Sequence, residues 1–174
     1  MINHIHLYNP DPDILRALAK TKIRVILGFD DYPLFVLLLA IESLYSALVA
    51  SNLHTQIKIS MPNAASIILD PFPPSQAFVN QSLIPIILPL IQFLSRTRSP
   101  LMFNLYPCYV FMQNKGLIPL DNSLFKPLTP SNEMVGPNTL LHYMNILDAM
   151  IDSAYFAMKN LNITDVLVLV TDSR

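Results

Sequence analysis

The chain has 174 residues, which suits one domain, and only 13% of them are charged, against about 25% in an average globular protein. The formal net charge is −1 without a basic patch, so we expect no nucleic-acid partner. The longest apolar run, 34–41, is too short for a transmembrane segment, which needs about 20 residues. The chain has only three glycines and cannot contain a glycine-rich phosphate-binding motif, so we expect no nucleotide cofactor.

Strand and helix patterns alternate through the first half of the chain. Residues 2–8 and 22–29 read as strands, separated by a helix over 13–20 that Asp13 can cap. Apolar residues at three- and four-residue spacing then predict a helix over 37–51. A third strand is expected over 56–60.

The second half repeats this alternation. A helix is expected over 82–96, delayed or kinked by its two prolines, and a long helix over 138–161. Apolar runs predict strands over 101–105 and 166–170. Five strands alternating with helices indicate an α/β protein with a parallel sheet.

The connection over 106–137 is unusually long and rich in Pro, Asn and Ser. It follows the strand over 101–105 and begins with three aromatic residues, Tyr106, Tyr109 and Phe111. Long loops at the carboxyl ends of parallel strands often carry function. The aromatic residues are therefore either core residues or platforms on which sugars stack.

Few carboxylates are placed for catalysis. Asp172 directly follows the strand over 166–170 and would project from its carboxyl end, although a turn or cap residue is the alternative. Glu42 is expected on a helix surface and Glu133 in a solvated loop. Asp30 and Asp31 follow an earlier strand and are expected in a turn.

The spacing of the histidines and the cysteine does not match that of a metal-binding site or of an activated nucleophile. His4 and His6 share one strand face but lack a third ligand, so we expect no metal site there. His54 and His142 are isolated in the sequence, and Cys108 has no second cysteine to pair with.

Two glycosylation sequons begin at Asn80 and Asn162. The first residues show no basic segment followed by an apolar stretch, so no signal peptide is expected. The sequons favour export and the start of the chain does not.

Several motifs follow one another in the order found in a known family. They are HLYN (6–9), ALVA (47–50), KIS (58–60), FPPS (72–75), NLYPCY (104–109) and YMNILDAMIDSA (143–154). The chain thereby resembles glycoside hydrolase family 17, the plant endo-1,3-beta-glucanases. The run over 110–127 resembles the lipid-anchored branch of that family.

The resemblance implies a (β/α)8 barrel that hydrolyses 1,3-beta-glucan (callose) with retention, outside the cell, in the cell wall or anchored at the plasma membrane. It places Asp172 at the nucleophile position. It also assigns the glucan cleft to four residues: Tyr8, Asn104, Tyr106 and Tyr109.

The departures from the family predict an incomplete barrel of about five strands in one domain, 1–174. The acid-catalyst strand, V-G-N-E-V in the family, is missing between about 29 and 37, the first strand is missing, and the last strand would follow 174. The nucleophile motif T-E-S/T-G-W is reduced to Thr171-Asp172-Ser173-Arg174. We therefore expect an inactive or severely impaired glucanase; the alternatives are a non-catalytic glucan-binding remnant and a truncated product without a molecular role.

Overall fold

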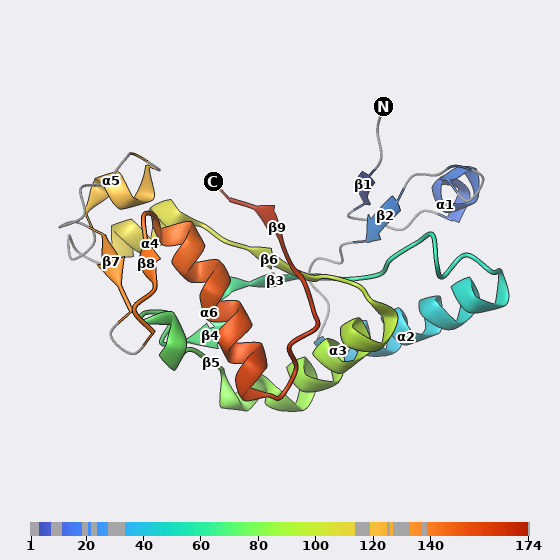
Figure 1. The fold of residues 1–174 in the computed structure, drawn as a ribbon. Helices are drawn as coiled ribbons and strands as arrows, with labels where there is room; N and C mark the ends of the chain where they lie inside the picture. The colour runs from blue at the N-terminus through green and yellow to red at the C-terminus, as the bar shows by residue number, and fades with distance from the viewer. Residues whose placement is uncertain are drawn as a thin grey trace.

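The computed structural model describes residues 4–7, 12–18, 21, 24–27, 34–113, 119–124, 126, 133–136 and 139–173. Over these residues the chain is an α/β protein in which five strands form two separate parallel ladders (Figure 1). This agrees with the α/β class and with the parallel pairing expected from the sequence.

The central sheet consists of β3 (Pro62–Ala64), β6 (Leu101–Asn104) and β9 (Val168–Asp172), in that order. β6 lies in the middle and is continuously apolar, and its first three residues are at most 1% exposed. Such a run is typical of a strand covered on both faces. A bulge after Phe103 brings Asn104 opposite Asp172, while Ala64 lies opposite Asn104 on the other side.

The second ladder pairs β1 (His4–Leu7) with β2 (Arg24–Leu27), and α1 (Pro12–Leu18) forms the crossover between them. Parallel strands joined through a helix are the repeating unit of α/β folds. Within the residues that the structure describes, no hydrogen-bonded ladder joins β2 to β3.

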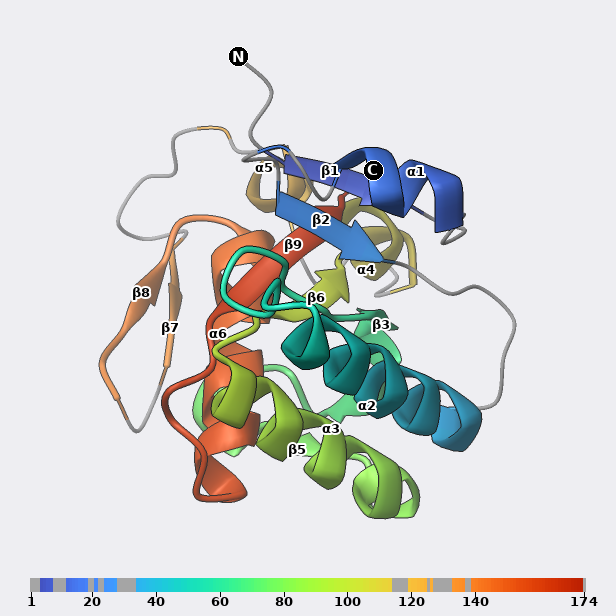
Figure 2. The ribbon, with the colours of Figure 1, turned by 90° about the vertical axis from the view of Figure 1, so that its right-hand side faces the viewer.

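Three long helices cover the central sheet: α2 (Leu34–Ala50), α3 (Ile84–Thr97) and α6 (Ile146–Asn160). α2 and α3 pack side by side (Figure 2). The apolar face of α3 is fully buried, including Leu90 and Leu94. This helix begins at Ile84, later than the predicted position 82, which confirms the expected delay. Pro85 lies in its first turn, where no amide donor is needed, and Pro89 lies inside it.

Shorter elements connect these units. Those before α3 are η1 (Ala65–Ile67), β4 (Ile68–Leu69), η2 (Pro74–Gln76), β5 (Phe78–Val79) and η3 (Gln81–Leu83). Those between β6 and α6 are α4 (Pro107–Gln113), α5 (Leu120–Ser123), β7 (Met134–Val135) and β8 (His142–Tyr143). β4 pairs with β5 and β7 with β8, both antiparallel, and both hairpins lie next to α6 (Figure 1).

The structure corrects the third predicted strand, which was placed at 56–60. Ile57 and Ile59 are buried as the pattern requires, yet the ladder begins only at β3. Side chains instead hold this segment, because Lys58 Nζ donates to Thr97 O at 2.7 Å and Ser60 Oγ to Pro100 O at 2.6 Å. An apolar run predicts burial, but only a neighbouring strand makes it part of a sheet.

The structure also corrects the helix predicted over 138–161, which begins at Ile146. Asn145 caps it, since its Oδ1 accepts a hydrogen bond from Asp148 N at 2.9 Å. The preceding β8 is held in its hairpin by β7. The predicted loop over 106–137 is wrong in character as well, because its described part contains α4, α5 and β7.

Among the described residues, no helix combines the length and the apolar character needed to cross a lipid bilayer.

Candidate functional site

The carboxyl ends of the three central strands bring a row of residues together. Ala64, Asn104 and Asp172 lie side by side in register across β3, β6 and β9. Thr171 Oγ1 donates to Asn104 Oδ1 at 2.7 Å and lies 3.2 Å from Phe103 O. These contacts orient the amide of Asn104 at the edge where α/β enzymes carry their sites.

Asp172 is tied to the segment that follows β6. Tyr106 Oη donates to Asp172 Oδ2 at 3.2 Å, and Leu105 N donates to the main-chain oxygen of Asp172 at 2.8 Å. Because a phenol donates to this carboxylate, the negative charge has a fixed partner at the sheet edge. The Asp172 side chain is half-buried and retains access to the surface.

Two tyrosines form an aromatic pair beside this carboxylate. The rings of Tyr106 and Tyr109 have centroids 5.3 Å apart and planes inclined by 59°. Tyr109 is 56% exposed, so one of its faces is open to a ligand, and Phe111, further along α4, is partly buried. Cys108, between the tyrosines, is an exposed free thiol.

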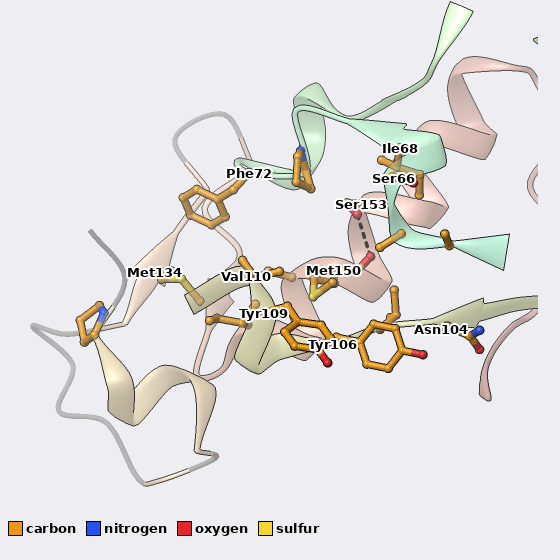
Figure 3. Close-up of a pocket in the computed structure, with 17 residues that line it drawn as sticks. Ser66, Ile68, Phe72, Asn104, Tyr106, Tyr109, Val110, Met134, Met150 and Ser153 are labelled. Atoms are coloured by element: carbon orange, nitrogen blue, oxygen red, sulfur yellow. Dashed lines mark hydrogen bonds between the residues drawn. The ribbon is translucent and has the colours of Figure 1, made fainter. Parts of the chain in front are cut away.

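A cavity of about 720 Å³ opens next to the pair (Figure 3). This volume lies within the range of small-molecule sites, about 300–1,000 Å³. Its walls come from the β3–β4 region, the end of β6, α4 and the first half of α6. The lining residues are Ala64, Ala65, Ser66, Ile68, Pro71, Phe72, Asn104, Leu105, Tyr106, Tyr109, Val110, Pro119, Met134, Ile146, Ala149, Met150 and Ser153.

Phe72 lies across the cavity from the tyrosines and is 47% exposed (Figure 3). The buried Tyr143 supports it in an edge-to-face contact, with ring centroids 6.5 Å apart. Tyr143 Oη in turn donates to Asp152 Oδ2 on α6 at 3.0 Å. Burial, followed by the hydrogen bond and the charge of Asp152, raises the pKa of Tyr143 to about 12.

The structure brings together four of the residues singled out from the sequence: Asn104, Tyr106, Tyr109 and Asp172. Tyr8, the remaining cleft candidate, lies outside the described residues. Sequence reasoning missed the α6 wall of the cavity. Its residues, at positions 146, 149, 150 and 153, show the three- and four-residue spacing of a helix face, so periodicity within the last helix could have marked it.

The other candidate carboxylates have structural partners. Glu42 Oε1 lies 3.9 Å from Arg96 Nη2, and both side chains are at least half exposed, which confirms the prediction of a helix-surface charge. The prediction that Glu133 is a solvated charge is wrong, because His142, which is isolated in the sequence, is its partner in the fold. Glu133 Oε2 lies 2.8 Å from His142 Nδ1, and the Glu133 side chain is only 14% exposed. The hairpin pairing of β7 with β8 creates this contact.

The remaining candidate aspartates and histidines do not form a second catalytic or metal-binding site among the described residues. Asp30 and Asp31 lie outside the described residues, as do the side chains of His4 and His6. The His54 ring packs edge-to-face on Tyr45, 6.2 Å between centroids. Across the described part of the chain, no three His, Cys, Asp or Glu residues are grouped to hold a metal ion.

The two sequon asparagines differ in their surroundings. Asn80 Oδ1 accepts hydrogen bonds from Ser82 N at 3.1 Å and Ser82 Oγ at 2.9 Å, and the side chain is partly buried. Asn162 is exposed after the end of α6 with a φ of 60°. Of the two, Asn162 is the more accessible to modification.

Comparison with known proteins gives consistent matches. The model of glycosyl hydrolases family 17 matches residues 33–173. Glucan endo-1,3-beta-glucosidase 1 of Arabidopsis thaliana is 54% identical over 216 positions, which cover 99% of this chain and 42% of that protein. Glucan endo-1,3-beta-glucosidase 3 of the same plant is 51% identical, with 99% and 43% covered. The solved structure of CJP38, a beta-1,3-glucanase and allergen of Cryptomeria japonica pollen, superposes with a TM-score of 0.82 at 26% identity, covering 99% of this chain and 66% of that one.

The chain spans less than half the length of these two curated relatives. The alignments run over 216 positions although the chain has 174 residues, so at least 42 aligned positions have no residue here. The family match begins at residue 33, inside the interval between 29 and 37 where the sequence predicts a missing strand.

Proposed function

The chain belongs to glycosyl hydrolases family 17, and we propose that it binds 1,3-beta-glucan at the carboxyl edge of its central sheet while hydrolysing that polymer poorly or not at all. The observation that carries this proposal is the hydrogen bond from Tyr106 to Asp172 beside the exposed ring of Tyr109. It joins the proposed sugar-stacking surface to the carboxylate that we assign to the nucleophile position of the family.

The binding half of the proposal follows from the residue types at this edge. The apolar face of a pyranose ring stacks on an aromatic ring, and Tyr109 offers an exposed face. The Nδ2 group of Asn104 is a donor suited to a sugar hydroxyl, because its Oδ1 already accepts from Thr171. Stacking supplies affinity and the amide supplies orientation.

The catalytic half follows from the geometry of retaining glycosidases. Two carboxyl groups about 5–5.5 Å apart are needed, one to attack the anomeric carbon and one to protonate the leaving oxygen. Asp172 is proposed as the attacking group. Its side chain is one methylene shorter than glutamate, and a shortfall of roughly 1–1.5 Å costs on the order of 100-fold in rate.

The proton donor is the second deficiency. The V-G-N-E-V motif does not occur in this sequence, and the family match begins where it would lie. Glu42 and Glu133, the only glutamates, are paired with Arg96 and His142. Without an acid, departure of a sugar oxygen slows by a factor of about 10² to 10⁴. The two deficiencies together predict severely impaired hydrolysis.

We further propose that residues 1–174 form one partial barrel domain of the lipid-anchored branch. The run over 110–127 supports the branch assignment. The two separate parallel ladders support the incomplete barrel.

Native affinity electrophoresis in gels with and without laminarin, a soluble 1,3-beta-glucan, tests the binding. We expect laminarin to retard the protein, and Tyr109→Ala to remove most of the retardation. Phe156→Ala is the matched control, since this aromatic residue on α6 lies under Lys159 and does not line the cavity. Retardation unchanged by Tyr109→Ala would contradict the placement of the site.

A parallel assay of reducing-sugar release separates the alternatives. Retardation without sugar release is the expected result. Turnover of laminarin that Asp172→Ala abolishes would overturn the claim of impaired hydrolysis. A protein that shows neither retardation nor release would have no role on this glucan, which would reject both halves of the proposal.

A further inference from the structure

We propose that the cavity beside the strand edge takes an apolar aglycone, so that this site binds β-glucosides carrying an alkyl or aryl group. The sugar half of this inference rests on the proposed function. The apolar half rests on the cavity itself.

The residues that line the cavity are mostly apolar. Twelve of its seventeen residues are apolar. Three of them, Ile146, Ala149 and Met150, are buried residues of α6, and we call this wall of the cavity the α6 base. The one polar residue of this helix wall, Ser153, donates its hydroxyl to Met150 O at 2.7 Å (Figure 3). The base therefore offers a ligand little besides carbon surface.

A glucan unit does not suit such a base. Every sugar hydroxyl that left water there without finding a partner would weaken binding, because a buried polar group without a hydrogen bond loses its hydration uncompensated. An alkyl chain or an aromatic ring has no polar hydration to lose, and its transfer out of water makes the binding free energy more favourable. The wall chemistry thus selects an apolar group.

The polar end of the same cavity explains why that group should be attached to a sugar. Asn104 and Tyr106 line the cavity where it meets the strand edge, and Tyr106 donates to Asp172 there. Phe72 and Tyr109, which are both exposed, also line the cavity (Figure 3). A glucosyl unit at this end would direct the substituent on its anomeric oxygen toward the α6 base.

Titration calorimetry with methyl and hexyl β-D-glucoside tests this proposal on the full chain. Because each additional buried methylene strengthens binding several-fold, we expect hexyl β-D-glucoside to bind at least about tenfold more tightly than the methyl compound. Ala64→Leu should reduce that preference about tenfold, because a branched side chain at the end of β3 would narrow the way from the strand edge to the α6 base. Ala64 is exposed at the end of β3, so the substitution should not impair folding. Ala47→Leu, the same change on an exposed position of α2, is the matched control and should leave the preference unchanged.

The outcomes separate this inference from the proposed function. Retardation by laminarin together with equal affinity for the two glucosides would overturn the aglycone site and leave glucan binding intact. A hexyl preference that Ala64→Leu does not reduce would place the apolar contact elsewhere and also overturn the inference. A hexyl preference lost in Ala64→Leu, without retardation by laminarin, would support the cavity and reject the polymer as its ligand. Hexanol that binds as tightly as hexyl β-D-glucoside would overturn the glucoside assignment.

Discussion

The two parallel ladders of this protein differ in how completely the rest of the chain supports them. β3, β6 and β9 form a sheet that α3 and α6 cover, and the side chains of its middle strand are almost fully buried. β1 and β2 form a two-stranded ladder that no pairing joins to that sheet among the described residues. Two strands alone are marginal in water, whereas three with a covered face are not.

This difference follows the family match. The matched residues, 33–173, include the whole central sheet and leave out β1 and β2. The proposed site residues Asn104 and Asp172 lie on the supported sheet. The proposed loss of the acid catalyst lies between β2 and α2, in the part of the chain that connects the two ladders. The same part of the chain therefore bears on the separation of the ladders and on the proposed lack of a proton donor.

Restoring that part of the chain should have the largest effect. We expect insertion of a family-type strand ending in V-G-N-E-V between residues 29 and 37 to raise sugar release from laminarin by about 10² to 10⁴-fold, because its glutamate would supply the proton donor that we propose is missing. The matched control carries the same insert with glutamine in place of that glutamate. Equal activity of the two inserts would mean that closing the sheet, and not the acid, limits the present chain.

The stability of the two ladders can be compared directly. Phe103 is fully buried at the centre of the supported sheet, so Phe103→Ala should lower the free energy of unfolding by about 3–5 kcal/mol. Ile26→Ala in β2 should cost clearly less, because its ladder has only two strands. Urea denaturation followed by circular dichroism measures both. Equal losses would show that the ladders unfold as one unit.

Much of the central sheet could be predicted from the sequence, because β6 and β9 are apolar runs bounded by polar residues. The same reasoning failed at 56–60, where Ile57 and Ile59 are buried as expected but no strand pairs with them. Periodicity reports which side chains are buried. Pairing depends on which segment lies alongside, and no local pattern contains that information.

The residues of the candidate site that lie at the end of a strand could be predicted from the sequence. Asn104, Tyr106 and Asp172 each sit at or just beyond such an end, and the structure brings them together. Phe72 and the α6 wall were not identified as site residues, since they reach the cavity from elements distant in sequence. The contact of Glu133 with His142 was missed for the same reason, because it depends on a hairpin whose strands have only two residues each.

The proposed attacking group, Asp172, gives a narrower test of the site at the edge of the central sheet. On a dinitrophenyl β-glycoside of laminaribiose, whose leaving group departs without protonation, Asp172→Glu should raise the rate about 100-fold by extending the carboxylate toward the anomeric carbon. Asp165→Glu, the same change at an exposed position, should not alter it. Release of dinitrophenolate measures the rate. An unchanged or lower rate in Asp172→Glu would mean that the position of this carboxylate is not what limits attack.

The smallest expected effect concerns the support behind Phe72. Asp152→Asn should lower the free energy of unfolding by about 1 kcal/mol at neutral pH, because the hydrogen bond from buried Tyr143 then has a neutral acceptor. It should also lower the pKa of Tyr143 from about 12 by removing the adjacent charge. Since the pKa is raised on folding, the neutral phenol contributes stability in full below about pH 10, and this contribution is lost as the pH rises toward 12. Ultraviolet titration of the phenolate and urea denaturation between pH 8 and 12 measure both effects. Asp148→Asn, a change on the same helix at a carboxylate that accepts from Asn145, should leave the titration of Tyr143 unchanged. A tyrosine titration identical in wild type and Asp152→Asn would show that Asp152 does not hold this phenol neutral.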